Sequence, residues 1–401
     1  MFAALCVLFF ILMTNDPSAA LNVDLSAFYA ASVQAFTRGS SPYDVAALQQ
    51  IRGDGVTVPP YIYPPTSLLL FYPLSFFSWS GAQQVMWYGN VVVTAALAWL
   101  LPLALCQLLM SKRLAMSVVC LAATMLFGPV VVTLHHGQIN LLLLLSLVMF
   151  WVLSRSGRAG AASVCLLIAI LLKTYPVVLL PLLACLGRKR EVLYTSLLLV
   201  VTVALSCIIL PSGLWSEWMT QIAPSGFYTR APEGLHQPAA IWNQSLNGIF
   251  CRLFTENEWS TPLVVNPELA RVFTYGAAAL VALLAGWGVW RCRSYPRSID
   301  RMMLIALPSL YLVAPLSWEH HLVYLLPVLL MLFTSEHSWS VGNTRALRIL
   351  VIGLWALFAL PQLLAIKGYG VVALWALSLL VATREGALRA PPRVVIEKLS
   401  A

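Results

Sequence analysis

The chain has 401 residues, of which 60% are hydrophobic and only 10% are charged. Charged residues make up about 25% of a water-soluble domain, so this composition excludes an ordinary soluble protein. Solid apolar blocks such as residues 141–148 also exclude a transmembrane β-barrel, whose segments alternate apolar and polar residues. The sequence therefore predicts an all-α polytopic membrane protein.

The net charge of +9 comes largely from basic residues that stand in groups between the apolar runs. Lys and Arg collect at the cytoplasmic ends of short loops, so we interpret the charge as a topology signal and predict no nucleic-acid partner. The groups are Lys112 and Arg113; Arg155 and Arg158; Arg188, Lys189 and Arg190; Arg291, Arg293, Arg297 and Arg301; Arg345 and Arg348; and Arg384, Arg389, Arg393 and Lys398.

Because every basic group is predicted to lie on the cytoplasmic side, the chain must cross the membrane an even number of times between one group and the next. The predicted outward and returning segments are residues 114–134, 138–154, 191–211 and 269–290, with hairpins over 302–334 and 349–383. Because Arg158 and Arg188 both lie inside, the chain between them must turn outside, at Lys173. With residues 1–13 as the first span, we expect about 12 helices in one domain over residues 1–401.

Both termini are predicted inside, and two long external loops cover about residues 14–80 and 212–268. Residues 68–77 are too short to span and should form a helix at the outer face. Residues 22–29 have the spacing of an amphipathic helix on the membrane surface. The positions of the cysteines predict no disulfides.

Polar residues from five separate parts of the chain are predicted to meet on the outer face. Ionisable groups at membrane depth are costly and mark functional sites more often than not. A carboxylate, histidines and cations suit a reaction in which an alcohol loses a proton and an anion departs, as in glycosyl or phosphoryl transfer. The candidates are Asp24, Tyr63, His135, His136, Gln138, Asn140, Lys173, Tyr175, Arg230, His236, Asn243, Gln244, Glu319, His320 and His321.

Each main candidate also has a structural interpretation. Asp24 is as suited to capping its helix as to acting as a base. Lys173 can extend to the membrane interface, and His135 and His136 can be satisfied by hydrogen bonds alone.

We predict no metal site and no cofactor, although a divalent metal remains compatible with these residues. The adjacent His320 and His321 diverge on a helix, unlike ligands spaced four residues apart. No glycine-rich phosphate loop is present, which argues against ATP as the energy source.

The order of several short motifs resembles glycosyltransferase family 87, whose members have the GT-C fold. The motifs are Asp24 with Phe28 and Tyr29; Gly39 to Asp44; Tyr63, Pro64 and Pro65; Gly137 to Asn140; Lys173 to Pro176; Asn243 to Leu246; and Trp318 to His321. The resemblance implies a GT-C-like bundle and an inverting transferase that moves a hexose, mannose above all, from a polyprenyl-phosphate carrier.

The resemblance also implies roles for individual residues. An Asp of the first external loop is the general base in such enzymes, and Asp24 is the matching position. Lys173, Arg230, His320 and His321 are expected to hold the donor phosphate. The expected substrate-binding residues are Tyr63, His135, His136, Gln138, Asn140, Tyr175, Asn243, Gln244 and Glu319, and Glu319 is also the main rival base.

The expected partners are a polyprenyl-phosphate sugar, a lipid-linked or glycan acceptor and membrane lipids. The expected location is the bacterial inner membrane, with the site on the non-cytoplasmic face. A transporter of a charged or lipid-linked solute is one alternative, although the chain lacks the internal repeats typical of transporters. A GT-C ligase or polymerase that uses a lipid pyrophosphate donor is another.

Overall fold

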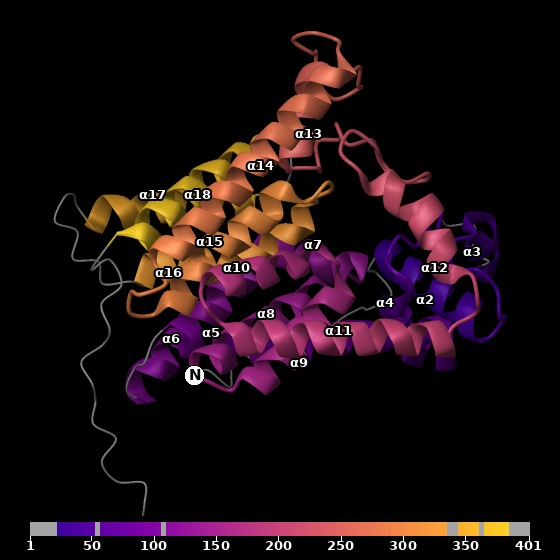
Figure 1. Cartoon of the computed structure of the whole chain (residues 1–401), viewed down its shortest axis with the longest axis horizontal. Coiled ribbons are helices and arrows are strands. Elements are labelled where there is room, and N and C mark those ends of the chain that lie inside the picture. The colour runs from indigo at the N-terminus through magenta and orange to yellow at the C-terminus, as the bar shows by residue number, and fades with distance from the viewer. Residues whose placement is uncertain (1–21, 53–56, 106–109, 335–343, 361–364, 385–401) are drawn as a thin grey trace, which may run out of the picture.

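The computed structural model describes residues 22–52, 57–105, 110–334, 344–360 and 365–384 (Figure 1). Within these ranges the chain forms helices and no β-strand, which confirms the predicted all-α class. The first predicted span, residues 1–13, and the tail residues Arg389, Arg393 and Lys398 lie outside the described residues.

Three helices in the described part of the chain are long and apolar enough to cross a membrane: α5 (Trp79–Leu105), α11 (Lys189–Ile209) and α14 (Pro267–Arg291). A fourth candidate is the bent pair α6 (Met110–Met125) and α7 (Gly128–His136). The predicted number of about 12 spans is therefore not confirmed, since a full crossing takes about 20 residues. The other apolar helices are shorter: α8 (Asn140–Arg155), α9 (Ala159–Leu172), α10 (Leu179–Cys185), α15 (Ser298–Val313), α16 (Leu326–Thr334), α17 (Thr344–Ala359) and α18 (Lys367–Thr383).

The predicted straight segment 114–134 is broken instead, with a bend of 64° between its two halves. Pro129 stands in the first turn of α7 and cannot donate the backbone hydrogen bond that would continue α6. The new helix also passes against α17 so closely that a Cβ on Gly128 would lie 2.2 Å from the carbonyl oxygen of Ala359. The proline and this contact together end the first helix and redirect the chain.

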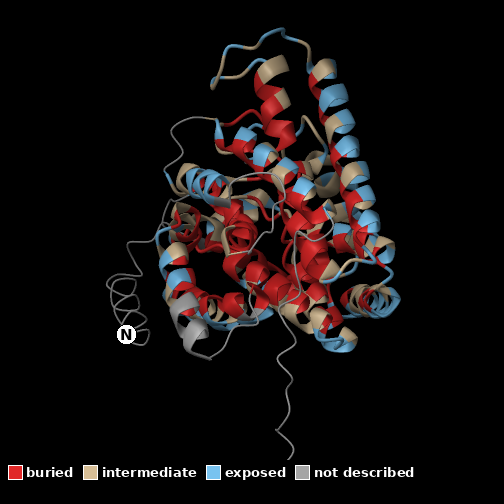
Figure 2. Ribbon diagram, turned by 90° about the vertical axis from the view of Figure 1, so that its left-hand side faces the viewer, coloured by how far each residue is buried: buried red, intermediate tan, exposed pale blue. Residues whose placement is uncertain are grey.

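Helix α11 shows most clearly that the chain lies in a membrane. Only 11% of its most apolar 18-residue stretch is buried inside the protein. Leu193, Val200 and Ile208 are 62%, 65% and 79% exposed, respectively. Figure 2 shows the buried residues in the centre of the molecule, with exposed residues on the surrounding helices. Such an apolar exterior is stable against lipid and not against water.

One end of the helical bundle gathers basic residues that we predicted to be cytoplasmic. The buried carboxylate of Asp300 pairs with Arg155 at 3.3 Å and Arg297 at 2.5 Å, and it accepts a hydrogen bond from Trp151. Arg188 donates a hydrogen bond at 2.8 Å to the carbonyl of Ser154, the residue that precedes Arg155 of this cluster. These contacts bring three of the predicted basic groups to the same end.

The first of the two long loops folds into α2 (Val23–Phe36), α3 (Val45–Arg52), α4 (Pro65–Phe71) and the 3-10 helix η2 (Tyr72–Phe76). Helix α4 has seven residues, which agrees with the predicted non-spanning helix. Helix α2 is buried on most sides, so the prediction that this segment is an amphipathic surface helix was wrong. Its small residues let it pack inside the protein.

The second loop folds into α12 (Leu214–Glu217), the π-helix η4 (Trp218–Ile222), the 3-10 helix η5 (Ala223–Gly226) and α13 (Leu246–Phe254). The two loops meet directly, and Figure 1 shows α12 beside α2 and α3. Ser41 donates to Glu217 at 2.8 Å, and Trp218 donates to the carbonyl of Ile62 at 3.2 Å. The two loops, which contain α2 to η2 and α12 to α13, thus pack together, and we call this region the cap.

Candidate functional site

A cavity of about 470 Å³ lies under this cap and brings together distant parts of the chain. It is lined by α2, the turn between α7 and α8, the break after α9, the second loop, and the 3-10 helix η6 (Glu319–Leu325) with the residues before it. The predicted site residues in its lining are Asp24, Tyr63, Gln138, Lys173, Tyr175 and His321. These residues come from four of the five predicted parts of the chain, and the second loop lines the cavity with residues other than those predicted.

Asp24 stands in the first turn of α2 with its side chain 25% exposed. Its Oδ2 atom lies 3.5 Å from Nδ1 of His136, the last residue of α7. Burial alone would raise the pKa of Asp24, but the hydrogen bond with His136 and the charges of His320 and His136 outweigh it and lower the pKa. The carboxylate is ionised at neutral pH and can accept a proton.

The approach of α2 to the end of α7 depends on Gly137. This residue has a φ of +65°, and a Cβ there would lie 2.6 Å from Cβ of Leu25 and 2.8 Å from Oδ1 of Asn22. The backbone N–H of Asn22 donates to the carbonyl of His135 at 2.8 Å across the same contact. Glycine alone permits both the left-handed backbone and this separation, and it thereby holds Asp24 against His136.

Lys173 ends α9 and is only 6% exposed, although it lines the cavity. Its Nζ atom lies 2.5 Å from Nε2 of His321. Burial lowers the pKa of Lys173 to about 7, and the charge of Asp24 opposes that change. The cavity therefore has a carboxylate and an amine that gains or loses its charge near neutral pH.

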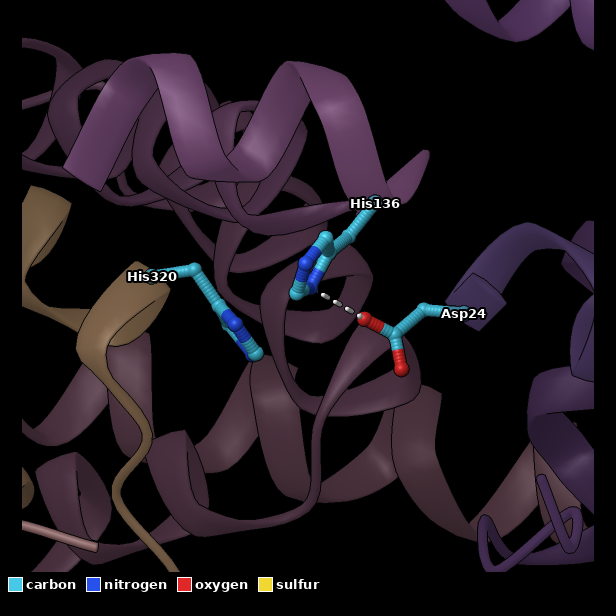
Figure 3. Close-up of side chains that lie close together, drawn as sticks. All are labelled: Asp24, His136 and His320. Carbon is cyan, nitrogen blue, oxygen red and sulfur yellow. Dashed lines mark ion pairs between the residues drawn. The ribbon is translucent and has the colours of Figure 1, made fainter. Parts of the chain in front are cut away.

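Three ligating side chains also meet at the edge of this site, as Figure 3 shows. Asp24, His136 and His320 each offer one ligand atom, and these atoms all lie within 4.8 Å of one another. They come from α2, α7 and η6. No spacing rule within one helix could have predicted this set, because each member stands on a different element.

The sequence profile of glycosyltransferase family 87 matches residues 61–316, well over half of the chain. The chain belongs to glycosyltransferase family 87. This match covers Tyr63, Gln138 and Lys173, while Asp24 and His321 fall outside the matched residues.

A curated relative supports the same family. The polyprenol-phosphate-mannose-dependent alpha-(1-2)-phosphatidylinositol pentamannoside mannosyltransferase of Mycobacterium tuberculosis (strain CDC 1551 / Oshkosh) is 25% identical over 277 residues. The alignment covers 68% of this chain and 58% of the relative, so it spans little more than half of the relative's length. No solved structure matches the chain.

Three predicted substrate-binding residues of this family 87 member make buried structural contacts and do not line the cavity. Asn140 accepts a hydrogen bond from Tyr324 at 2.5 Å. Asn243 donates to the carbonyl of Pro315 at 3.2 Å and accepts from the backbone N–H of Ser317 at 3.0 Å. Gln244 accepts from the backbone N–H of Gly368 at 2.7 Å. These amides fix the segments around the site, and the prediction that they bind substrate gains no support.

Glu319, the predicted rival base, is held by a residue that the sequence reasoning did not assign to the site. Lys367 lies at the start of α18, and its Nζ atom is 2.5 Å from Oε1 of Glu319. The two side chains are 3% and 11% exposed, respectively, and neither lines the cavity. This buried ion pair attaches the last hairpin to η6, so Glu319 is held away from the cavity that Asp24 lines.

Arg230 and His135 are exposed and lie outside the cavity lining. The ring of His135 packs edge-on against Trp87, and the ring of His236 packs at a tilt of 42° against Trp242. His320 also stays outside the lining, beside Asp24 and His136. The predictions that Arg230 holds phosphate and that His135 binds substrate gain no support from this geometry.

One wall of the cavity was missed by the sequence reasoning. The second loop contributes Trp218, Ile222, Phe227 and Leu235 to the lining. The available signal was the number of large apolar residues in a loop that the sequence predicts to be external. The family 87 cavity is thus lined both by charged residues and by large apolar residues.

Proposed function

We propose that this family 87 member is a membrane glycosyltransferase that moves mannose from a polyprenyl phosphate to a hydroxyl group of a lipid-linked or glycan acceptor. The relative's name supports the donor and the sugar. The observation that carries the proposal is that Asp24 and Lys173 line one cavity. A base can take the proton that the acceptor hydroxyl loses, and a cation can stabilise the negative charge of the departing phosphate.

The reaction needs a proton acceptor on one side of the anomeric carbon. The acceptor hydroxyl gives its proton to the carboxylate of Asp24 while its oxygen forms the bond to the anomeric carbon. The bond between that carbon and the phosphate oxygen breaks in the same displacement, so the configuration is inverted. A positioned base typically contributes about 10²- to 10⁴-fold to the rate. His136, 3.5 Å from Asp24, orients the carboxylate.

The departing polyprenyl phosphate needs a positive charge on the other side. The ammonium form of Lys173 supplies it in a poorly solvated position, where a charge-assisted contact is stronger than in water. His321 contacts Lys173 and lines the same cavity, so it helps to hold the phosphate. Tyr63, Tyr175 and Trp318 give the cavity aromatic faces that suit a sugar ring.

The apolar residues of the cavity lining suit the polyprenyl chain. Trp218, Ile222 and Phe227 line it, and Phe227 is also 56% exposed, so the wall continues to the exterior. The cluster around Asp300, Arg155 and Arg297 marks the end of the bundle that we predict to be cytoplasmic. We propose that the reaction takes place on the opposite, non-cytoplasmic face of the membrane, and that this membrane is the bacterial inner membrane.

The test is transfer of label by membranes that contain the protein. They are incubated with polyprenyl-phosphate mannose, glucose or arabinose, and with a lipid-pyrophosphate glycan as the donor of a ligase or polymerase. We expect label from the mannose donor in a lipid or glycan product. Transfer from the lipid pyrophosphate alone would replace this function with that of a ligase.

The role of Asp24 is tested with a matched pair of substitutions. Asp24→Asn should lower turnover by about 10²- to 10⁴-fold and leave donor binding intact, because the amide cannot accept the proton. Asp44 is exposed in the same loop, where it accepts a hydrogen bond from the N–H of Ala47 at 3.0 Å. Asp44→Asn should retain turnover. If Asp24→Asn stays within a few-fold of the parent, the base is another residue.

A further inference from the structure

The cluster of Asp24, His136 and His320 has the composition of a transition-metal site. Two imidazoles and one carboxylate are ligands that Zn²⁺ accepts, whereas Mg²⁺ and Ca²⁺ prefer oxygen ligands throughout. The three side chains project from α2, α7 and η6 toward a common point (Figure 3). An ion at that point would join three elements that the chain brings together only in the folded state.

The distances are close to those of a tetrahedral site. With bonds of about 2.0–2.2 Å to zinc, two ligand atoms of a tetrahedron stand about 3.4 Å apart. Oδ2 of Asp24 and Nδ1 of His136 are already 3.5 Å apart. The ligand atoms of the whole set lie within 4.8 Å of one another, so side-chain movement of about 1 Å would complete the geometry.

An independent observation comes from His320. Its side chain is only 6% exposed, and its Nε2 atom is buried with no hydrogen-bond partner among the described residues. A buried polar atom is almost always satisfied by a protein group, a water molecule or an ion. The side chains of His136 and Asp24 are 33% and 25% exposed, so the cluster is partly open to an ion from outside.

We propose that Asp24, His136 and His320 bind a divalent ion of the Zn²⁺ class, and that the bound ion inhibits the transferase. The inhibitory part rests on the proposed function of Asp24. A carboxylate oxygen that donates its lone pair to a dication has lost its basicity, so the acceptor hydroxyl keeps its proton. The ion and the reaction therefore compete for the same carboxylate.

Binding is measured without reference to activity. The full chain, purified in lipid nanodiscs and freed of metal with a chelator, is titrated with Zn²⁺ by calorimetry and with Co²⁺ by visible absorption. We expect one ion per chain and the absorption of a tetrahedral Co²⁺ site. Absence of saturable binding by the parent would overturn the proposal.

Two variants and a matched control locate the ion. Removing a residue that only hydrogen-bonds to a metal ligand lowers the metal affinity about 10- to 100-fold. Removing one of the ligands themselves should lower the affinity by at least as much. We expect this loss for His320→Ala and for His136→Ala. His135 is exposed and outside the cluster, and His135→Ala should bind as the parent does. If His320→Ala does not fold, the partly exposed His136 carries the same test, and unchanged affinity in a folded variant refutes the site.

The activity measurement separates the inference from the proposed function. Zn²⁺ should inhibit sugar transfer by the parent at the concentrations that fill the site, and EDTA should restore it. If transfer depends on Asp24 but Zn²⁺ neither binds nor inhibits, the metal site is refuted and the transferase stands. If Zn²⁺ binds through His136 and His320 but no sugar donor is used, the binding site stands and the transferase falls, together with the inhibitory role.

Discussion

Nζ of Lys173 lies 2.5 Å from Nε2 of His321, and Nδ1 of the same imidazole accepts a hydrogen bond from the backbone N–H of Trp318 at 3.2 Å. A neutral imidazole has one N–H and one acceptor nitrogen. Since Nδ1 accepts, Nε2 carries the proton and donates it to Lys173, which must then be the neutral amine. This agrees with the lowering of the Lys173 pKa to about 7 by burial.

Donor binding should therefore weaken at alkaline pH. Only the ammonium form of Lys173 attracts the donor phosphate, and its fraction falls as pH rises through about 7. Above that pH, the affinity for polyprenyl-phosphate mannose should drop by up to about tenfold per pH unit until the pKa of the bound state is passed.

The control for this pH dependence is Lys173→Arg, because a guanidinium stays protonated throughout the range. Equilibrium binding of the donor between pH 6 and pH 9 provides the measurement. A pH-dependent parent and a pH-independent arginine variant are expected. An identical slope in both proteins would assign the titration to another group.

The buried pair of Glu319 and Lys367 should contribute to stability and not to the proton transfer. Removing one member leaves the other charge buried and unpaired, which costs about 3–5 kcal/mol. Thermal unfolding in detergent should show this loss for Lys367→Met, and Glu319→Gln together with Lys367→Met should recover part of it.

Glu268 and Arg271 form an exposed ion pair that serves as the control. Exposed pairs contribute about 0–1 kcal/mol, so Glu268→Gln should leave the unfolding temperature nearly unchanged. The double variant, Glu319→Gln with Lys367→Met, should keep the sugar-transfer rate of the parent when the rate is divided by the amount of folded protein. Loss of turnover with retained folding would return Glu319 to the list of candidate bases.

Gly137→Ala should reduce transfer by displacing Asp24. The added Cβ would stand 2.6 Å from Leu25, so α2 must move away from α7 and the pair of Asp24 and His136 must open. A backbone in the left-handed region costs about 1–3 kcal/mol for a residue with a side chain. We expect at least a tenfold loss of turnover, measured per folded molecule.

Gly157→Ala separates backbone strain from displacement. Gly157 has a φ of +75° with no atom within 4 Å of the Cβ position, so alanine adds strain there without a clash. It should lower stability and retain turnover. Equal losses of turnover in both variants would show that strain alone explains the effect.

The orientation of the protein is tested by labelling single cysteines in intact cells, after the native cysteines have been replaced. Thr174 is exposed beside Lys173, and Lys189 is exposed in the basic group after α10. An impermeant maleimide should react with Thr174→Cys and spare Lys189→Cys until the cells are opened. The reverse pattern would invert the topology and place the site in the cytoplasm.

The sequence by itself determined the class of protein and the positions of many helices. Hydropathy is a property of each segment, so α11 and α14 begin and end within two residues of the predicted runs. The break at Lys173 and the short helix α4 followed from the positions of charges and prolines. The basic groups likewise predicted that several loops lie at one end of the bundle, because the preference of Lys and Arg for the cytoplasmic side depends only on the residues of each loop.

Tertiary structure decided which polar residues line the cavity. Asn140, Asn243 and Gln244 had the residue types of a binding site, yet their partners in the fold turn them into structural amides. Glu319 was the main rival of Asp24 as the expected base, and nothing in the sequence indicated that Lys367 from the last hairpin would pair with it.

The meeting of Asp24 with His136 and His320 was equally invisible along the chain. A residue's charge and size are fixed by its type, whereas its partners depend on how separate helices pack against one another. Those contacts join segments far apart in sequence, and no local pattern records them.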